Sequence, residues 1–248
     1  MLAPPVELLR CPACAGSLRT AAGQLQCEAC GRSYPLRDGV PELLLTPQPP
    51  DGGDGSSLAR ALHALVAVPA VYDAVQRVAG REALYRRLRA ALVDVAAASV
   101  LDVGAGTGRL ATILPSSARY IWLDGDPQKL SGFQGTAHVT AVLADATRIP
   151  FADATVDWVV SVGVSHHLAG EAFGAMLDEL RRVARERVVF LDAVATPAWK
   201  SRLLWRYDRG AHPRTADELR RALHSRFDVV SDDEFSVLHR YLLIAGRP

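Results

Sequence analysis

A glycine-rich turn in the middle of the chain has the residue types that bind a nucleotide. Residues 100–108 read VLDVGAGTG, an apolar strand pattern with an acid, followed by three glycines. Glycine has no Cβ, so its backbone lets a ligand approach closely. A second apolar run ends at Asp124, 22 residues after Asp102, and an acid at about this distance binds ribose hydroxyls in nucleotide-binding folds. The pattern predicts a nucleotide site, and a purely structural glycine turn is the alternative.

The spacing of the glycines indicates which nucleotide is bound. Dinucleotide-binding folds use G-x-G-x-x-G, in which the third glycine lets the helix pack close to the strand. This chain has G-x-G-x-G, and Arg109 stands at the position of that third glycine. In this form the turn resembles motif I of class I S-adenosylmethionine-dependent methyltransferases. The resemblance implies that the methionine part of the cofactor passes over Gly104 and Gly106.

Three later segments resemble further motifs of these enzymes, in the expected order. Residues 124–127, DGDP, are similar to motif II, and residues 142–151, VLADATRIPF, to the segment whose acid receives the adenine amino group. Residues 156–168, VDWVVSVGVSHHL, are similar to the fourth-strand motif of methyltransferases related to the ubiquinone and menaquinone pathway enzymes. The resemblance implies that S-adenosyl-L-methionine is bound by Asp102, Gly104, Ala105, Gly106, Gly108, Asp124, Gly125, Asp145, Ala146, Ser161 and Val162.

The resemblance covers roughly residues 96–195 and implies an α/β fold. We expect a Rossmann-like sheet of seven strands with helices on both faces, in which residues 227–248 form the last two strands. A chain of 248 residues has room for one such domain and a small module, and its hydrophobic content of 49% supports a real core.

All four cysteines lie in the first 30 residues. Cys11 and Cys14 form one C-x-x-C pair, Cys27 and Cys30 form another, and 12 residues separate the two pairs. Each pair is able to present two thiolates to a tetrahedral Zn²⁺, and so short a segment cannot be stabilised by its own core alone. The spacing predicts a closed structural zinc site. Two disulfides, or a knuckle without metal, are the alternatives.

Residues 31–44 continue this segment as GRSYPLRDGVPELL. The whole stretch resembles the small zinc-ribbon protein that, as a separate subunit, activates tRNA and protein methyltransferases. We therefore expect a zinc-ribbon domain over residues 1–46, a linker rich in Pro, Gly and Ser over 47–57, and a methyltransferase domain over 58–248. The ribbon would dock on the enzyme and stabilise it, or it would present the substrate.

The catalytic residues are less well defined by the sequence. Methyl transfer from a sulfonium is an in-line displacement, and it needs a base only when the acceptor must lose a proton. His166 and His167 follow the fourth strand, where such a base would lie, so both are catalytic candidates; structural packing is the alternative. Methyltransferases of exocyclic adenine amines place Asn or Asp before Pro-Pro-Tyr here, so residues 165–167 argue against an adenine N6 acceptor.

Two further segments are expected to flank the site. Residues 58–98 have apolar residues at helical spacing, and Tyr72 among them resembles a tyrosine that lies near the cofactor in related enzymes; a core position is the alternative. An aromatic and basic insert follows the fifth strand. Its residues Arg202, Arg206 and Arg209 would clamp a carboxylate or phosphate, or bind RNA phosphates, or lie on a solvated amphipathic helix.

Composition limits the partners of this expected methyltransferase. The formal net charge is +1 and the isoelectric point is about 7.8, so the basic character of most RNA-binding proteins is missing. We therefore expect a small-molecule acceptor methylated at O, N or C, with RNA as the alternative; a protein acceptor and a non-catalytic cofactor-binding protein are further possibilities. No apolar run approaches the roughly 20 residues of a membrane helix, and no export signal is recognisable, so we expect a cytoplasmic protein without a membrane partner.

Overall fold

The structure is a computed structural model that describes residues 3–46, 81–131, 133, 139–207, 210–237 and 239–248. The expected linker, Tyr72, Arg209 and the helical segment before residue 81 lie outside the described residues. Among the described residues, no helix combines the length and the apolar character needed to cross a bilayer.

Residues 99–247 are built on the seven strands that the sequence predicts. Their bounds are β5 (Ser99–Val103), β6 (Arg119–Asp124), β7 (Thr140–Ala144), β8 (Val156–Val162), β9 (Ala184–Val194), β10 (Asp228–Ser236) and β11 (Arg240–Arg247). They lie side by side in the order β7-β6-β5-β8-β9-β11-β10, and the first five are parallel. The last two form an antiparallel hairpin that joins the sheet at β9. Parallel strands are buried on both faces, which explains why β5 to β9 are nearly continuous apolar runs.

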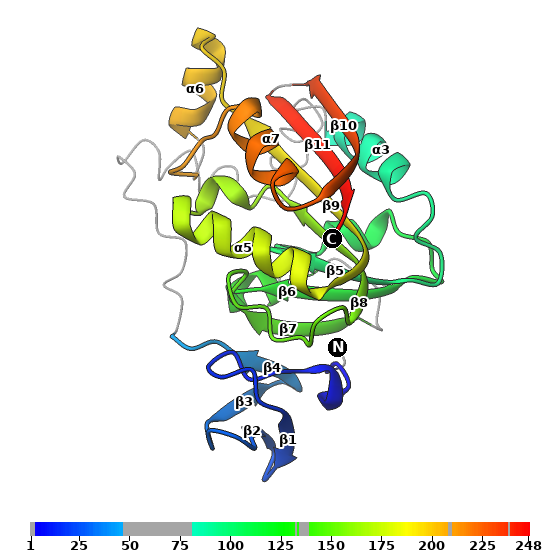
Figure 1. The fold of residues 1–248 in the computed structure, drawn as a ribbon, viewed down its shortest axis with the longest axis vertical. Helices are drawn as coiled ribbons and strands as arrows, with labels where there is room; N and C mark the ends of the chain where they lie inside the picture. Colours follow the sequence, from blue (N-terminus) through cyan, green and yellow to red (C-terminus); the bar gives the residue numbers. More distant parts are fainter. Residues whose placement is uncertain (1–2, 47–80, 132, 134–138, 208–209, 238) are drawn as a thin grey trace.

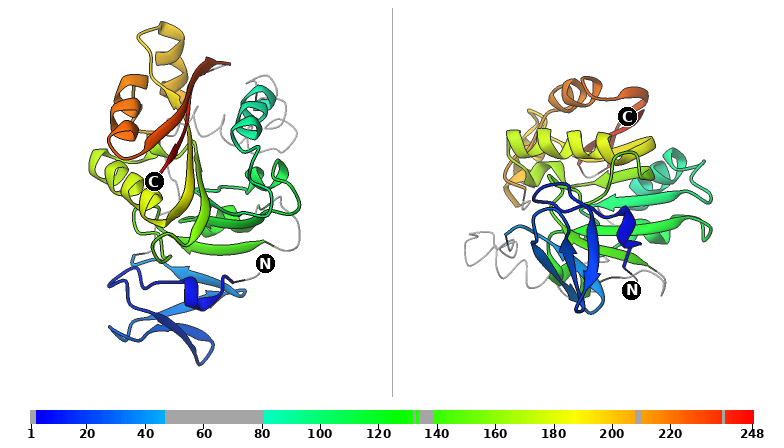
Figure 2. Two further views of the ribbon diagram at one scale, coloured as in Figure 1. Left: turned by 45° about the vertical axis from the view of Figure 1, so that its right-hand side comes forward. Right: turned by 60° about the horizontal axis from the view of Figure 1, so that its bottom comes forward.

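Helices cover both faces of this sheet (Figures 1 and 2). On one face α5 (Gly170–Val183) and α7 (Ala216–His224) pack on the sheet through buried side chains such as Leu177 and Leu219. On the other face α3 (Arg81–Ala91) contributes Leu84 and Leu88 to a second cluster. The shorter helices are α4 (Pro127–Ser131) after β6 and α6 (Trp199–Tyr207) after β9. The Rossmann-like α/β fold is therefore confirmed.

Residues 3–43 form a small antiparallel ribbon at the β7 edge of the sheet. A short 3₁₀ helix, η1 (Val6–Leu8), precedes four strands: β1 (Leu18–Ala21), β2 (Gln24–Cys27), β3 (Ser33–Arg37) and β4 (Val40–Leu43). Strand β4 then pairs in parallel with β7, so that ribbon and catalytic strands form one continuous sheet (Figure 1). The ribbon thus covers a sheet edge whose backbone groups would otherwise face water.

A second backbone contact joins the ribbon to the loop that follows β7. Leu9 and Phe151 form an antiparallel bridge, in which the amide of Arg10 donates to the carbonyl of Pro150 at 3.0 Å. The amide of Ala152 donates to Leu8 at 3.1 Å. Leu9 and Phe151 are almost completely buried in the same cluster as the ribbon side chains, so the ribbon and the sheet share a core.

This shared core predicts that ribbon and sheet unfold together. The change Leu9→Ala leaves a cavity at the contact and should lower the free energy of unfolding by about 2–5 kcal/mol. Fluorescence of the buried Trp122 and Trp158, which report on the sheet, should follow the same single transition as circular dichroism. The exposed Val93→Ala should change stability by less than about 0.5 kcal/mol. An unchanged tryptophan transition in Leu9→Ala would contradict the shared core.

Candidate functional site

A cavity of about 270 Å³ lies where β5, β6, β7 and β8 end. Ligands of open α/β sheets bind at this carboxyl edge of the strands. Of the residues predicted to bind the cofactor or act in catalysis, the structure brings seven to the cavity wall: Gly104, Gly106, Asp124, Gly125, Asp145, Ala146 and His167. Lys129 of α4 also lines the cavity, and the sequence motifs did not indicate it.

The glycine turn after β5 leaves no room for side chains on its protein side. Gly104 has φ +71°, and a Cβ there would lie 2.3 Å from Cγ2 of Val164. Gly106 has φ +54°, and its amide donates to Oδ2 of Asp124 at 2.8 Å. The indole of Trp122 donates to the Gly106 carbonyl at 2.9 Å. The turn is therefore fixed by the end of the neighbouring strand β6.

The two acids that the motifs place at this site differ in position. Asp124 faces the cavity and accepts hydrogen bonds from the amides of Gly106 and Asp126. These bonds favour the ionised carboxylate, but burial outweighs them and raises the pKa of Asp124. Asp102 lies behind the turn, is 3% exposed, and accepts a hydrogen bond from the hydroxyl of Tyr120 at 2.7 Å. Burial, together with the nearby charge of Asp124, raises the pKa of Asp102 to about 7, although the Tyr120 hydrogen bond opposes the shift. Asp102, which the resemblance implies as a cofactor-binding residue, therefore does not line the cavity.

Asp145 has a free carboxylate oxygen beside the cavity. The amide and the hydroxyl of Thr147 both donate to Oδ1, each at 2.8 Å. Among the described residues no donor reaches Oδ2, which leaves this oxygen for a ligand. The side chain is thus oriented before any ligand binds.

Four other predicted residues do not line the cavity. Ala105 belongs to the turn, and Gly108, with φ +72°, packs against the ring of Phe133. Ser161 and Val162 lie in β8 behind the cavity, where the adjacent Gly163 forms the wall instead. Ser161 is 1% exposed, and its hydroxyl has no hydrogen-bond partner in the structure.

The two candidate histidines are in different environments. His167 is exposed and lines the cavity. His166 is 9% exposed, and its Nδ1 lies 2.6 Å from Oδ1 of Asp192. A Cβ on Gly210 would lie 2.2 Å from the His166 ring, and Trp205 packs edge-on against the same ring. His166 is therefore held beneath the insert that follows β9.

Asp192 was not indicated by the sequence motifs, although it ends the apolar core of β9. The amide of Ser165 donates to its Oδ2 at 2.8 Å, and the hydroxyl of Ser165 does so at 2.6 Å. Burial opposes ionisation, but the hydrogen bond and charge of His166 and the bonds from Ser165 outweigh it and lower the pKa of Asp192. A buried carboxylate in this state keeps a proton on Nδ1 of His166.

The four cysteines come together in the ribbon. Their sulfur atoms all lie within 4.8 Å of one another, with Cys11 and Cys30 at 3.8 Å and Cys14 and Cys27 at 3.5 Å. A tetrahedral site with zinc–sulfur distances of about 2.3 Å has sulfur–sulfur edges of about 3.8 Å. All four are free cysteines, which disagrees with the disulfide alternative. The Tyr34 hydroxyl lies 3.0 Å from the Cys11 sulfur and supports the cluster from within the core.

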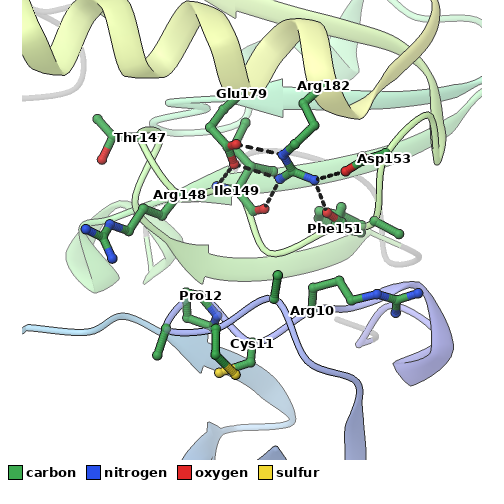
Figure 3. A pocket seen from close by; sticks show the side chains of 14 residues that line it. Arg10, Cys11, Pro12, Thr147, Arg148, Ile149, Phe151, Asp153, Glu179 and Arg182 are labelled. Carbon is green, nitrogen blue, oxygen red and sulfur yellow. Dashed lines mark hydrogen bonds and ion pairs between the residues drawn. The ribbon is translucent and has the colours of Figure 1, made fainter. Parts of the chain in front are cut away.

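A second cavity, of about 570 Å³, separates the cysteine knuckle from the loop after β7 (Figure 3). On one wall Arg182 binds Glu179, Asp153 and the carbonyls of Ile149 and Phe151, and so fastens the loop to α5. Two guanidinium groups lie toward opposite ends of the cleft in Figure 3 and meet no carboxylate among the described residues. They belong to Arg10 and Arg148.

Comparisons with known proteins identify both parts of the chain. Residues 100–187 match the family model of the methyltransferase domain, and residues 6–39 match the model of Trm112p-like proteins. The chain combines a methyltransferase domain with a Trm112p-like domain. An uncharacterized methyltransferase of Mycolicibacterium vanbaalenii is 34% identical over 91 residues. The match spans 35% of this chain and 35% of that relative, about a third of its length.

Solved structures have the same fold as the methyltransferase domain. The N-methyltransferase NodS of Bradyrhizobium japonicum, in complex with S-adenosyl-L-homocysteine, has a TM-score of 0.59 at 18% identity, over 77% of this chain and 98% of its own. Magnesium protoporphyrin IX methyltransferase of Synechocystis, with the same bound molecule, has a TM-score of 0.57 at 17% identity, over 76% of this chain and all of its own. A chain from a complex between the Haloferax volcanii Trm112 methyltransferase activator and a methyltransferase has a TM-score of 0.58 at 19% identity, over 70% of this chain and 94% of its own.

The buried Asp102 of the methyltransferase domain predicts a pH-dependent stability. Its pKa of about 7 in the folded chain exceeds the unfolded value of about 3.9, so the folded state binds more protons between these values. The free energy of unfolding therefore loses this contribution as pH rises from about 4 to about 7. Asp102→Asn keeps an acceptor for Tyr120 but cannot titrate. Its stability relative to wild type should rise over this range by on the order of 3 kcal/mol, measured by urea unfolding.

Asp157 offers a control of opposite sign. Its carboxylate accepts the amide and hydroxyl of Ser99 at 2.8 and 2.7 Å and pairs with Arg185. Despite burial, these bonds lower the pKa of Asp157. Stability from this group is present above its unfolded pKa and is lost as pH falls, so Asp157→Asn should become less stable than wild type as pH rises. If the stability of both variants relative to wild type changed with pH in the same direction, the prediction would be contradicted, because Asp102 would then be ionised in the folded chain.

Proposed function

We propose that the chain is an S-adenosylmethionine-dependent methyltransferase. The observation that carries this proposal is the cavity at the ends of β5 to β8, where a glycine turn that has no room for a Cβ at Gly104 meets two acids. Asp124 would receive the ribose hydroxyls, and Oδ2 of Asp145 would receive the adenine amino group. The backbone at Gly104 and Gly106 would face the methionine part. The bound cofactor would supply an electrophilic methyl group on a sulfonium.

The residues at the mouth of this cavity would orient the acceptor and manage its proton. Alignment of two reactants at about 3 Å supplies much of the rate of such a displacement. His167 lines the cavity and would accept a proton from an acceptor that must lose one. His166 would act as a positioning residue, because Asp192 and Trp205 fix its ring next to His167, with a centroid distance of 4.3 Å between the two imidazoles.

We also propose that the four cysteines hold a structural Zn²⁺. The sulfur–sulfur distances fit a tetrahedral site, and four thiolates leave no position for a substrate. The metal would fix the knuckle from which Leu9 and Arg10 reach the loop after β7. Zinc would therefore support the docking of the ribbon and take no part in methyl transfer.

The cofactor proposal is tested by calorimetric titration with S-adenosylhomocysteine. Protein that carries about one zinc per chain should bind it with a dissociation constant in about the micromolar range. Asp124→Ala removes both the acceptor for ribose and the anchor of the Gly106 amide, so affinity should fall by at least about tenfold. The exposed Asp94→Ala should bind as wild type does. Folded wild-type protein that binds no S-adenosylhomocysteine would exclude the proposal.

For the acceptor we propose a small molecule, because the balanced charge of the chain lacks the broad basic surface of RNA-binding proteins. One observation favours RNA as a second candidate. The cleft beside the ribbon carries the guanidinium groups of Arg10 and Arg148, which pair with no carboxylate among the described residues. Such groups bind phosphates of a nucleic-acid backbone.

Salt-dependent RNA binding distinguishes the two acceptors. If the cleft binds RNA, Arg148→Gln should weaken binding of a transcribed tRNA and reduce the slope of log affinity against log salt by about one. Arg181→Gln removes the same charge from the exposed side of α5, outside the cleft, and should have no such effect. If wild-type protein shows no salt-dependent mobility shift, the RNA alternative is excluded and the small-molecule proposal stands.

A further inference from the structure

A third cavity, of about 190 Å³, lies between the start of α6 and the turn that joins β10 to β11. Two basic side chains line it, Lys200 from α6 and Arg240 from β11. Three hydroxyl side chains complete its polar wall: Thr196, Ser201 and Ser236. No acidic side chain is among the lining residues. The lining of the cavity therefore presents positive charge and hydrogen-bond donors.

The charges of the two basic groups are only partly balanced by the protein. The ammonium of Lys200 lies 5.8 Å from the ring centroid of Trp199, and no carboxylate of the described residues pairs with it. Arg240 uses Nε to bind Glu234, a carboxylate that also binds Arg220 at 2.9 Å. Two guanidinium groups, those of Arg220 and Arg240, thus share the one carboxylate of Glu234. Charged donors of this kind bind carboxylates and phosphates through short, strong hydrogen bonds.

A row of aromatic and imidazole rings connects this cavity to the proposed cofactor site. His167 lines the cofactor cavity, and His239 lines the basic one. Between them stand His166 and Trp205, with successive centroid distances of 4.3, 5.6 and 5.4 Å along the row. The two cavities are thus only a few ring contacts apart along one wall. An acceptor at the cofactor site that is long enough to span this row of rings would bring its far end to Lys200 and Arg240.

We propose that the cavity at Lys200 and Arg240 binds the acidic group, a carboxylate or a phosphate, of an elongated methyl acceptor. This inference rests on the proposed methyltransferase function and names its substrate class, organic acids or phosphate esters. It also replaces the arginine clamp expected from the sequence. Arg202 and Arg206 are exposed on α6 and do not line the cavity, whereas Lys200 does.

The proposal is tested with inorganic phosphate and with acetate as probes on the whole protein. Trp199 and Trp205 lie next to Lys200 and His239, so their fluorescence should change saturably as an anion binds. Lys200→Met and Arg240→Gln should each weaken binding about tenfold, because each removes one charged donor. Arg247→Gln removes the same charge from the far end of β11 and should leave the affinity unchanged. A stronger response to phosphate than to acetate assigns phosphate esters, and the reverse assigns carboxylic acids.

Two outcomes overturn the proposal. One is a folded wild-type protein whose fluorescence shows no saturable response to either anion. The other is an equal loss of binding in Arg247→Gln, which would indicate an effect of net charge alone. Titration of the same samples with S-adenosylhomocysteine tests the methyltransferase proposal separately from the anion-site proposal. Cofactor binding without anion binding removes the inference alone, and anion binding without cofactor binding removes the methyltransferase function and leaves an anion site.

Discussion

The outer edge of β7 is the constraint on which the rest of the structure depends. A parallel sheet that ends at β7 exposes backbone N–H and C=O groups, and an uncovered edge invites pairing with other chains. Strand β4 of the ribbon pairs with the last two residues of β7, and the Leu9–Phe151 bridge extends the contact into the following loop. That loop begins at Asp145, which lines the cofactor cavity, and is fastened to α5 by Arg182. The loop that carries the carboxylate proposed to bind adenine is thus held by the ribbon and by α5 together.

Buried carboxylates at the strand ends show how hydrogen bonds determine charge in this domain. Asp102 and Asp192 are both nearly inaccessible to solvent. Asp102 accepts one hydrogen bond, from Tyr120, and burial raises its pKa. Asp192 accepts bonds from Ser165 and His166, and its pKa is lowered despite equal burial. The number and charge of the donors therefore decide which buried acid stays ionised. The carboxylate that stays ionised is that of Asp192, which lies next to His166.

The sequence predicted those parts of the fold and site that depend on local patterns. The glycine turn and Asp124 were predicted because a close backbone approach and a strand-ending acid each require particular residue types in particular places, and Asp145 was predicted from the resemblance to methyltransferases; the structure brings them to one cavity wall. The cysteine pairs were recognised because metal ligands need a fixed spacing, and the sulfur positions agree with that prediction. The parallel register of β4 on β7 left no local signal, since it depends on two segments about 100 residues apart in the chain. Asp192 was missed because its partner His166 comes from a different strand end, and an acid in an apolar run has no motif.

The insert after β9 shows how a helix separates basic residues that are close in sequence. The three basic residues of α6 are close in sequence, yet a helix distributes successive residues around its axis, and of these three only Lys200 lines the cavity. The second cation, Arg240, comes from the opposite side through the β10–β11 hairpin. Binding energy gained by these two groups at a distance from the sulfonium would align the acceptor for displacement. Alignment of this kind reduces the need for a strong base. This agrees with the lining of the cofactor cavity, where the exposed imidazole of His167 is the candidate base among the described residues.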